Sequence, residues 1–573
     1  MNINNVYPEK YAIVYTNKAK CRDCYRCVRV CPVHAIKMEG GQAQVIQENC
    51  IACGTCIAEC PQHAKAYRTD AGLVLQWIGS EIPMVISIAP SFATSYSEWE
   101  QKRLPSALRS LGFMHISETA VGAYYTAQAT AAYINENPNQ NHICTACPAA
   151  VSYVRQYAPK HVRELVPVAS PMLIHARLLK KKIRRAKVVF LGPCVAKKAE
   201  AINENNSDYI DAVLTFEELD EIFLQKGINL DNCEESGFDE LVVGDSRLFP
   251  LEGGLLKTAS LNTDLLGETH IALSGHESLK EVLEALPKNP QKPWIIEPLF
   301  CRHGCINGPG ARKKSAVYTQ RKAVLDYAEK HPGTDQIQEL TDEDIVAIYP
   351  PIKNTEKEFS IQEIEAVLAS IGKHGPEDEL NCMACGYNTC REKAIAVLNG
   401  QAELEMCMPY MRQMAEQKFE TMIALDPNGI VMLNEKLEII HMNPAFQKMF
   451  SCSDALSGRP ISYLIDPDDF EELVTGNSNL IRKTVTYSNY NLICHLMCYA
   501  MPEQKQYVGI FMDVTALQTN TEKLQEVKVE TVFQAQSLLD HQVAMAQDLA
   551  RFLGEHAAKG EVLLNKLIDS IQK

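Results

Sequence analysis

The chain has 573 residues, of which 46% are hydrophobic, and this length predicts several domains because one hydrophobic core does not grow so large. A net charge of −15 argues against a nucleic-acid partner, since no long Lys/Arg stripe offsets it. No run approaches the roughly 18 apolar residues of a membrane span, and residues 1–5 lack the basic and apolar regions of a signal peptide. We therefore expect a cytoplasmic protein without a membrane span, in which the 21 cysteines ligate metal and do not form disulfides.

Residues 1–75 contain two copies of one cysteine motif, C-x2-C-x2-C-x3-C-P, which is the signature of two-cluster bacterial ferredoxins. In that signature the fourth cysteine of each run ligates the cluster of the other run. One [4Fe-4S] cluster is therefore assigned to Cys21, Cys24, Cys27 and Cys60, and the other to Cys31, Cys50, Cys53 and Cys56. The alternatives are a zinc site or a disulfide knot, but two complete copies, each followed by proline, favour an electron-carrying ferredoxin-like α+β module.

Residues 80–355 alternate apolar runs with amphipathic patterns, which predicts parallel α/β layers. The clearest apolar runs are 84–90, 187–191 and 294–296. Three short cysteine motifs lie in this region: Thr145-Ala146-Cys147-Pro148, then Pro193-Cys194-Val195-Ala196-Lys197-Lys198, then Cys301-Arg302-His303-Gly304-Cys305. Each motif is weak alone, and their shared order behind a ferredoxin-like module makes them specific together.

In this order the motifs resemble those of the [FeFe] hydrogenases. The resemblance implies a two-lobed α/β H-domain that holds an H-cluster, a [4Fe-4S] cubane bridged to a two-iron unit with CO and cyanide ligands. It implies that Cys147, Cys194, Cys301 and Cys305 ligate the cubane, that Cys305 also bridges to the two-iron unit, and that Lys197 donates a hydrogen bond to a cyanide. The alternatives are ordinary buried cysteines or a relative without an H-cluster, and the presence of all four ligands argues against the second.

The chain departs from the catalytic members of that family near the implied cluster. Ala146 stands where they carry a proton-relaying cysteine, and the acidic residues expected after Val121-Gly122-Ala123 are missing. Gly192 and Leu299 replace methionines, whereas Glu200 in the second motif is retained. Because a positioned acid or base contributes about 10²–10⁴ in rate, these departures predict low turnover, which suits a detector better than a metabolic catalyst.

Residues 356–415 form a mostly helical pattern around a second cysteine array, C-x2-C-x4-C-x16-C, made by Cys382, Cys385, Cys390 and Cys407. It resembles the small [4Fe-4S] domain of corrinoid-reducing activators and of PAS-linked hydrogenases. Gly386 permits the turn that brings three thiolates together, and a helix from Ala394 to Leu404 is expected to return Cys407 to the array. A structural zinc site is the alternative. The cysteines outside all motifs are interpreted as small buried hydrophobic residues: Cys144, Cys233, Cys452, Cys494 and Cys498.

Residues 418–516 predict a small α/β domain that resembles PAS domains. Asn428-Gly429 is a turn signal, and the Asn443-Pro444-Ala445-Phe446 element and a closing segment over 509–515 fit the same family. His441 is a lone histidine at a strand end, so it is interpreted as structural and not as a haem ligand.

Residues 517–573 read as one long helix, because Val532, Leu539, Ala546 and Leu553 recur every seven residues. Val543 and Ala550 fill the alternate seam, which predicts a short coiled coil and a homodimer. The alternative is a helix packed on its own PAS core. No kinase, cyclase or phosphatase motif follows, so any output must come from a separate protein.

Together these features predict a PAS-linked sensory [FeFe] hydrogenase of the group C type. It would split H2 slowly and reversibly at the H-cluster and pass the redox signal through three [4Fe-4S] clusters to the PAS domain. Its expected partners are H2, hydrogenase maturation proteins, and an electron or signalling protein such as a phosphatase or kinase acting in trans. The alternatives are a catalytic [FeFe] hydrogenase subunit working with ferredoxin or a flavoprotein, and a non-enzymatic iron–sulfur scaffold or redox sensor.

Overall fold

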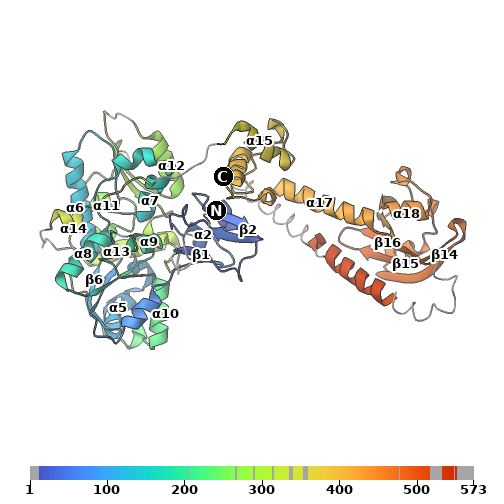
Figure 1. Cartoon of the computed structure of the whole chain (residues 1–573). Coiled ribbons are helices and arrows are strands. Elements are labelled where there is room, and N and C mark those ends of the chain that lie inside the picture. Colours follow the sequence, from blue (N-terminus) through green and yellow to red (C-terminus); the bar gives the residue numbers. More distant parts are fainter. Residues whose placement is uncertain are drawn as a thin grey trace, which may run out of the picture. The chain divides into compact units, whose positions relative to one another are not determined.

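The computed structural model describes residues 12–551, except 204, 265–266, 288–290, 313–314, 335–339, 353–358, 477, 516–531 and 548 (Figure 1). The chain divides into two compact units, Met1–Met411 and Arg412–Lys573. Within the described ranges, no helix has the length and apolar character that a membrane crossing requires.

The ferredoxin-like module is built from two short antiparallel strand pairs and two short helices. Strand β1 (Val14–Thr16) pairs with β4 (Lys65–Tyr67), and β2 (Ile36–Glu39) pairs with β3 (Gln42–Val45). Helices α1 (Arg26–Arg29) and α2 (Thr55–Ala58) each carry the third cysteine of one motif. The two motifs also have the same backbone conformation after their last cysteine. His34 and His63, each three residues after the fourth cysteine, both have φ of +48°.

The next region contains two parallel sheets, which form the two lobes expected of it. The first sheet has the order β6-β5-β8-β9, with β5 (Met84–Ile88), β6 (Phe113–Glu118), β8 (Lys187–Leu191) and β9 (Ala212–Leu214). One face packs on α3 (Ala71–Trp77), α5 (Glu98–Ser110) and α10 (Phe216–Lys226). The other face packs on α6 (Ala120–Glu136) and α8 (Pro171–Lys182).

The second sheet has the order β10-β11-β7, with β7 (His142–Ile143), β10 (His270–Ser274) and β11 (Ile295–Leu299). Helices α7 (Pro148–Tyr157) and α12 (His276–Ala285) pack on one face, and α11 (Gly254–Thr258) and α6 share a core with the other. Cys147, Cys194 and Cys301 follow β7, β8 and β11. Ligand-binding loops of open parallel sheets lie at these carboxyl ends, so strand direction brings the three motifs together.

Four further helices complete the lobes: α4 (Phe92–Ser95), α9 (Ala196–Ala201), α13 (Val317–Lys330) and α14 (Asp342–Ile345). The second array follows, with α15 (Ile361–Ser370), α16 (Cys390–Leu398) and α17 (Met408–Leu425). The helix expected over 394–404 is wrong in its bounds. Thr389 caps α16 by accepting the Glu392 N–H at 3.0 Å, and Gly400, with φ of +69°, lies in the turn after it.

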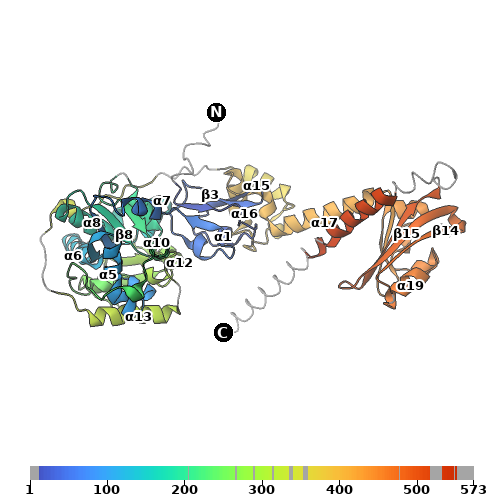
Figure 2. The same ribbon diagram turned by 90° about the horizontal axis from the view of Figure 1, so that it is seen from below.

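The second unit contains a five-stranded antiparallel sheet of order β13-β12-β16-β15-β14 (Figure 2). Its strands are β12 (Gly429–Leu433), β13 (Ile439–Met442), β14 (Leu480–Tyr487), β15 (Leu492–Met501) and β16 (Gln506–Asp513), and its helices are α18 (Pro444–Met449) and α19 (Asp468–Val474). Buried Asn443 holds the first strand to α18, because its Oδ1 accepts the N–H groups of Ile430 at 2.8 Å and Phe446 at 2.9 Å. His441 is exposed.

Residues 532–547 are helical, and most of their side chains are exposed. Leu539 and Val543 of the predicted seam are less exposed than Val532 and Ala546. Leu553 and the rest of 552–573 lie outside the described residues, as do 516–531. The coiled coil and the homodimer stay predictions.

Candidate functional site

The four cysteines of the three central motifs converge between the two lobes. Burial raises the pKa of the Cys301 thiol, and the neighbouring thiolates of Cys194, Cys305 and Cys147 raise it further. Burial likewise raises the pKa of Cys194 to about 12, and the thiolate of Cys147 raises it further. Crowded thiols of this kind resist deprotonation until a cationic centre compensates them, and an iron–sulfur cluster supplies that compensation. The donor set therefore fits a cubane.

Glycines let the second and third motifs approach each other closely. A Cβ on Gly304, whose φ is +82°, would overlap the carbonyl oxygen of Pro250, and one on Gly308 would lie 2.6 Å from the carbonyl oxygen of Pro193. The Gly310 N–H also donates to the Pro193 carbonyl at 2.8 Å. The loop after Cys305 is thus held directly against the loop before Cys194.

Lys197 lies beside this cysteine set. Its charge opposes the pKa rise that burial imposes on Cys194 and Cys305. Its ammonium donates to Ser170 Oγ at 2.9 Å and to Glu200 Oε2 at 2.7 Å. Because an ammonium has three N–H donors, one remains for a ligand in the site, and the predicted hydrogen bond to a cyanide stays a prediction.

Ala146 contacts an apolar cluster that includes Leu255, Leu256 and side chains of α6. Helix α6 contributes one acidic residue, Glu136 at its last position. Sequence reasoning missed one buried acid, Glu297. It accepts the N–H groups of Leu255 at 3.0 Å and Leu256 at 3.1 Å, and burial raises its pKa to about 7. A glutamate inside the apolar run 294–299 was the signal that could have revealed it.

The ferredoxin-like module groups its cysteines in the crossed pattern that the motif predicts. Burial raises the pKa of Cys27, and among cysteines Cys24, Cys21 and Cys60 raise it further. The same four cysteines line one cavity. For Cys56, burial is again the main cause of the raised pKa, and the neighbouring cysteines are Cys53, Cys50 and Cys31. Each set fits one cubane.

The second of these sets lies next to the central site. Burial raises the pKa of Cys53, and Cys147 is among the charges that raise it further. A Cβ on Gly54, whose φ is +75°, would overlap Pro309 and would lie 3.6 Å from Cβ of Val195. The loop of Cys53 therefore packs directly on the second and third central motifs.

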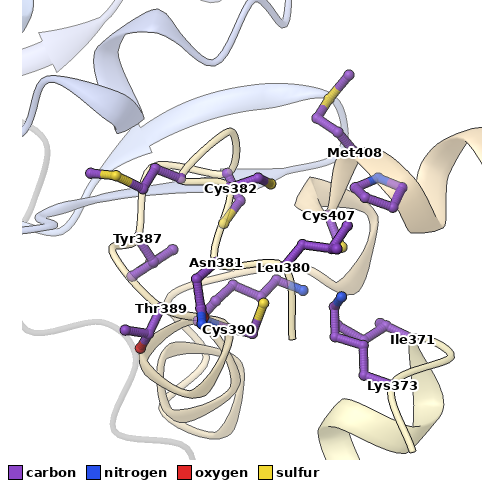
Figure 3. A pocket seen from close by; sticks show the side chains of 14 residues that line it. Ile371, Lys373, Leu380, Asn381, Cys382, Tyr387, Thr389, Cys390, Cys407 and Met408 are labelled. Carbon is purple, nitrogen blue, oxygen red and sulfur yellow. The ribbon is translucent and has the colours of Figure 1, made fainter. Parts of the chain in front are cut away.

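A further cavity is lined by all four cysteines of the second array (Figure 3). Cys382, Cys390 and Cys407 surround it in Figure 3, with Lys373 nearby. Lys393 also lines the cavity; it is 1% exposed and donates to the Leu404 carbonyl at 3.1 Å. Burial lowers the pKa of Lys393, and the thiolates of Cys407 and Cys385 oppose that change.

Each cysteine site thus contains a buried lysine: Lys65 in the ferredoxin-like module, Lys197 in the central site and Lys393 in the second array. Lys65 lowers the pKa of Cys27 and Cys56 against the larger effect of burial. Sequence reasoning missed Lys65 and Lys393. The sequence could have revealed Lys393 by its position. It lies three residues after Cys390 on α16, so both side chains are on the same face of the helix.

Within the residues that the structure describes, no group of three or more His, Cys, Asp or Glu side chains is arranged to hold a single metal ion. In a cubane each thiolate binds a different iron.

Four segments of the chain match family models. Residues 82–309 match the iron-only hydrogenase large subunit, C-terminal domain; residues 13–61 match the 4Fe-4S dicluster domain; residues 378–409 match an Fe-S cluster family; and residues 417–484 match the PAS domain. The chain therefore carries a hydrogenase large-subunit domain, iron–sulfur domains and a PAS domain. The exact domain boundaries stay predictions.

The chain is also similar to individual proteins of known name. The chain is 25% identical over 366 residues to the periplasmic [Fe] hydrogenase large subunit of Nitratidesulfovibrio vulgaris, covering 53% of this chain and 87% of that protein. It is 25% identical over 307 residues to the cytosolic Fe-S cluster assembly factor NAR1 of Eremothecium gossypii, covering 42% and 68%. A solved variant of the [FeFe]-hydrogenase HydA1 from Chlamydomonas reinhardtii is 18% identical with a TM-score of 0.36, covering 45% of this chain and 88% of that chain.

Proposed function

We propose that this chain is a cytoplasmic, PAS-linked sensory [FeFe] hydrogenase of the group C type. The observation that carries the proposal is Ala146, an apolar residue in a four-cysteine site that otherwise keeps its ligands and its lysine. Such a site retains the means to hold an H-cluster and lacks the side chain that would relay protons quickly. A protein that reports H2 needs equilibration and not high turnover.

In this proposal Cys147, Cys194, Cys301 and Cys305 would hold the cubane of the H-cluster, and Cys305 would also hold the two-iron unit. The H-cluster, when bound, supplies the two-electron chemistry of H2. Glu200 and Ser170 hold the ammonium of Lys197 in place, and its remaining N–H would donate to a cyanide ligand of the bound cluster. The apolar residues around Ala146 keep water from the cluster on that side.

The energetics suit graded detection. For a two-electron couple, a tenfold change in H2 pressure shifts the potential by about 30 mV, or roughly 1.4 kcal/mol. A free-energy shift of that size changes the ratio of the two states of a switching element about tenfold. The proposed element is the PAS domain with its flanking helices.

The second array offers a covalent route to that element. Helix α17 begins at Met408, directly after Cys407, and ends at Leu425, four residues before β12. We assign a third [4Fe-4S] cluster to Cys382, Cys385, Cys390 and Cys407. A change of one charge at the start of this helix is the proposed signal.

The test is hydrogen exchange on residues 418–515 of the matured full chain, with and without H2. We expect an H2-dependent difference in the natural chain and none in Cys385→Ser, which loses a cluster ligand. Cys233→Ser serves as the control, because Cys233 lies outside every motif and should leave the difference intact. A difference that survives in Cys385→Ser would refute the signalling route.

A second candidate function is an iron–sulfur scaffold that never receives a two-iron unit. It is favoured by the match to the assembly factor of Eremothecium gossypii and by Ala146. Infrared bands from bound CO and cyanide, in protein made with maturation proteins, separate it from a hydrogenase.

A further inference from the structure

We propose that the second array exchanges electrons with the cluster site of Cys31, Cys50, Cys53 and Cys56, across the stacked rings of His34 and Tyr387. This inference rests on the proposed function for the source of electrons, and it names how they reach the array. It makes the ferredoxin-like module a junction with one branch to the central site and another to the array.

The array and the ferredoxin-like module share one hydrophobic core although about 350 residues separate them in the chain. The core contains Cys27 and Val28 from the module, and Tyr387 and Met406 from the array segment. Cys31 and Cys385 pack against it as partly buried members. Cysteines of both ferredoxin-type sets and of the array therefore border the same core, and the stacked rings single out the Cys31 set.

The contact is close at the backbone. Arg29 donates from one guanidinium nitrogen to the Cys24 carbonyl at 3.0 Å and from another to the Ala384 carbonyl at 3.4 Å. Gly386 has φ of +93°, and a Cβ there would lie 3.1 Å from Cα of Arg29. The glycine that forms the turn of the array thus also permits its docking on α1.

The rings of His34 and Tyr387 bridge the two sites. Their centroids are 4.7 Å apart and their planes differ by 18°, which is a stacked arrangement. His34 follows Cys31 by three residues and Tyr387 follows Cys385 by two. The stack therefore joins the loop after Cys31 to the turn after Cys385.

Two polar atoms of this pair lack partners. Nδ1 of His34 and the hydroxyl of Tyr387 are buried without a hydrogen-bond partner among the described residues. Leaving a buried polar group unpaired is unfavourable, because the group has lost its hydrogen bonds to water. Sulfur atoms of a bound cluster can accept such hydrogen bonds, so both atoms are able to pair with a cluster near the stack.

The transfer itself is a one-electron exchange. One electron leaves the reduced Cys31 site and enters the array. No proton moves, and no bond forms or breaks. H2 oxidation at the central site supplies the electron in the proposed function, and the loop of Cys53 packs on the central motifs, since a Cβ on Gly54 would overlap Pro309. Dithionite supplies it in the test.

The test is electron paramagnetic resonance of the full chain, reconstituted with iron and sulfide and reduced with dithionite, so it needs neither H2 nor the two-iron unit. We expect the signal of the array to be split by spin coupling to a second reduced cluster. The splitting should vanish in Cys53→Ser and persist in Cys24→Ser. An unsplit array signal, or a splitting lost only in Cys24→Ser, would overturn the proposal.

The role of the rings is tested by rapid-freeze kinetics after mixing the matured chain with H2. Tyr387→Phe keeps the stack and should reduce the array as fast as the natural chain, whereas Tyr387→Leu should reduce it more slowly. The N-terminal clusters should be reduced at the natural rate in both variants. Equal array kinetics in Phe and Leu variants would overturn the role of the stack. Failure of every cluster to be reduced by H2 would instead refute the proposed function, and the dithionite spectra would still test the wiring.

Discussion

The ammonium of Lys197 lies 2.7 Å from Oε2 of Glu200, on the side of α9 that faces the central cysteines. The pair is largely buried, with the side chains 10% and 13% exposed. The next residue, Lys198, points elsewhere and pairs with Glu218. These two consecutive lysines thus have different roles. Lys197 lies at the central cysteine site, and Lys198 lies at the junction with the ferredoxin-like module.

The first prediction concerns Ala146. Ala146→Cys should raise H2 oxidation by matured protein, because it restores a thiol where catalytic relatives relay protons. The gain should fall below the full factor of about 10²–10⁴ that a positioned acid or base gives, since α6 supplies no acid nearby. Ala146→Ser is the matched control, with a hydroxyl that is a poor proton donor. A natural chain that already turns over as fast as the cysteine variant would contradict the sensory proposal.

The second prediction concerns the Lys198–Glu218 pair. Its atoms are 2.8 Å apart and the side chains are 0% and 4% exposed. Glu218 also accepts the N–H of Asp70 at 3.1 Å, which ties the ferredoxin-like module to the hydrogenase domain. Glu218→Gln should lower the free energy of unfolding by about 3–5 kcal/mol, measured by denaturant titration, because it leaves a buried charge unpaired.

The control for that experiment is Glu268→Gln. Glu268 pairs with Lys292 at the surface, where the side chains are 73% and 71% exposed. We expect no measurable change, since exposed pairs contribute little. An equal effect of both variants would show that the buried pair has no special part in stability.

The third prediction concerns Lys393. Lys393→Met removes a positive charge from the cavity of the second array and should lower the potential of its cluster, because the reduced form carries more negative charge. We expect a shift on the order of 100 mV, about 2 kcal/mol for one electron, in a redox titration followed by electron paramagnetic resonance. Lys436→Met, at an exposed position of the PAS domain, should leave that potential unchanged. A potential that is the same in both variants would contradict this role.

The fourth prediction concerns metal content. Three cubanes and one H-cluster give about 18 iron atoms for each chain, with little zinc. Elemental analysis of fully matured protein measures both. About 8 iron atoms for each chain would contradict the assignment of both the H-cluster and the third cubane, because the two ferredoxin-type clusters alone account for that number.

Much of the site was predictable because short-range spacing determines it. The placing of Cys60 with Cys27 follows from the duplicated motif, and both cysteines line one cavity, while their assignment to one cluster stays a prediction. The strands at 84–88 and 187–191 follow from continuous apolar runs, as buried parallel strands should. The grouping of Cys147 with Cys194 follows once both are placed after parallel strands.

Other features depend on contacts that no local pattern encodes. The stack of His34 on Tyr387 joins distant parts of the chain, and neither residue differs from an ordinary loop residue in sequence. The start of α16, in contrast, could have been predicted from the sequence, because Thr389 followed three residues later by Glu392 is a helix-capping signal. Buried Lys393 was missed because lysine in a helix is usually solvated.

The proposed function requires a two-iron unit with CO and cyanide that is held at the central cysteine site and responds to H2. Infrared spectroscopy of the full chain, produced with hydrogenase maturation proteins and titrated with H2, detects such a unit. We expect CO and cyanide bands that shift reversibly as H2 replaces inert gas. Protein whose cubanes are loaded but which shows no such bands, or bands that ignore H2, would contradict it.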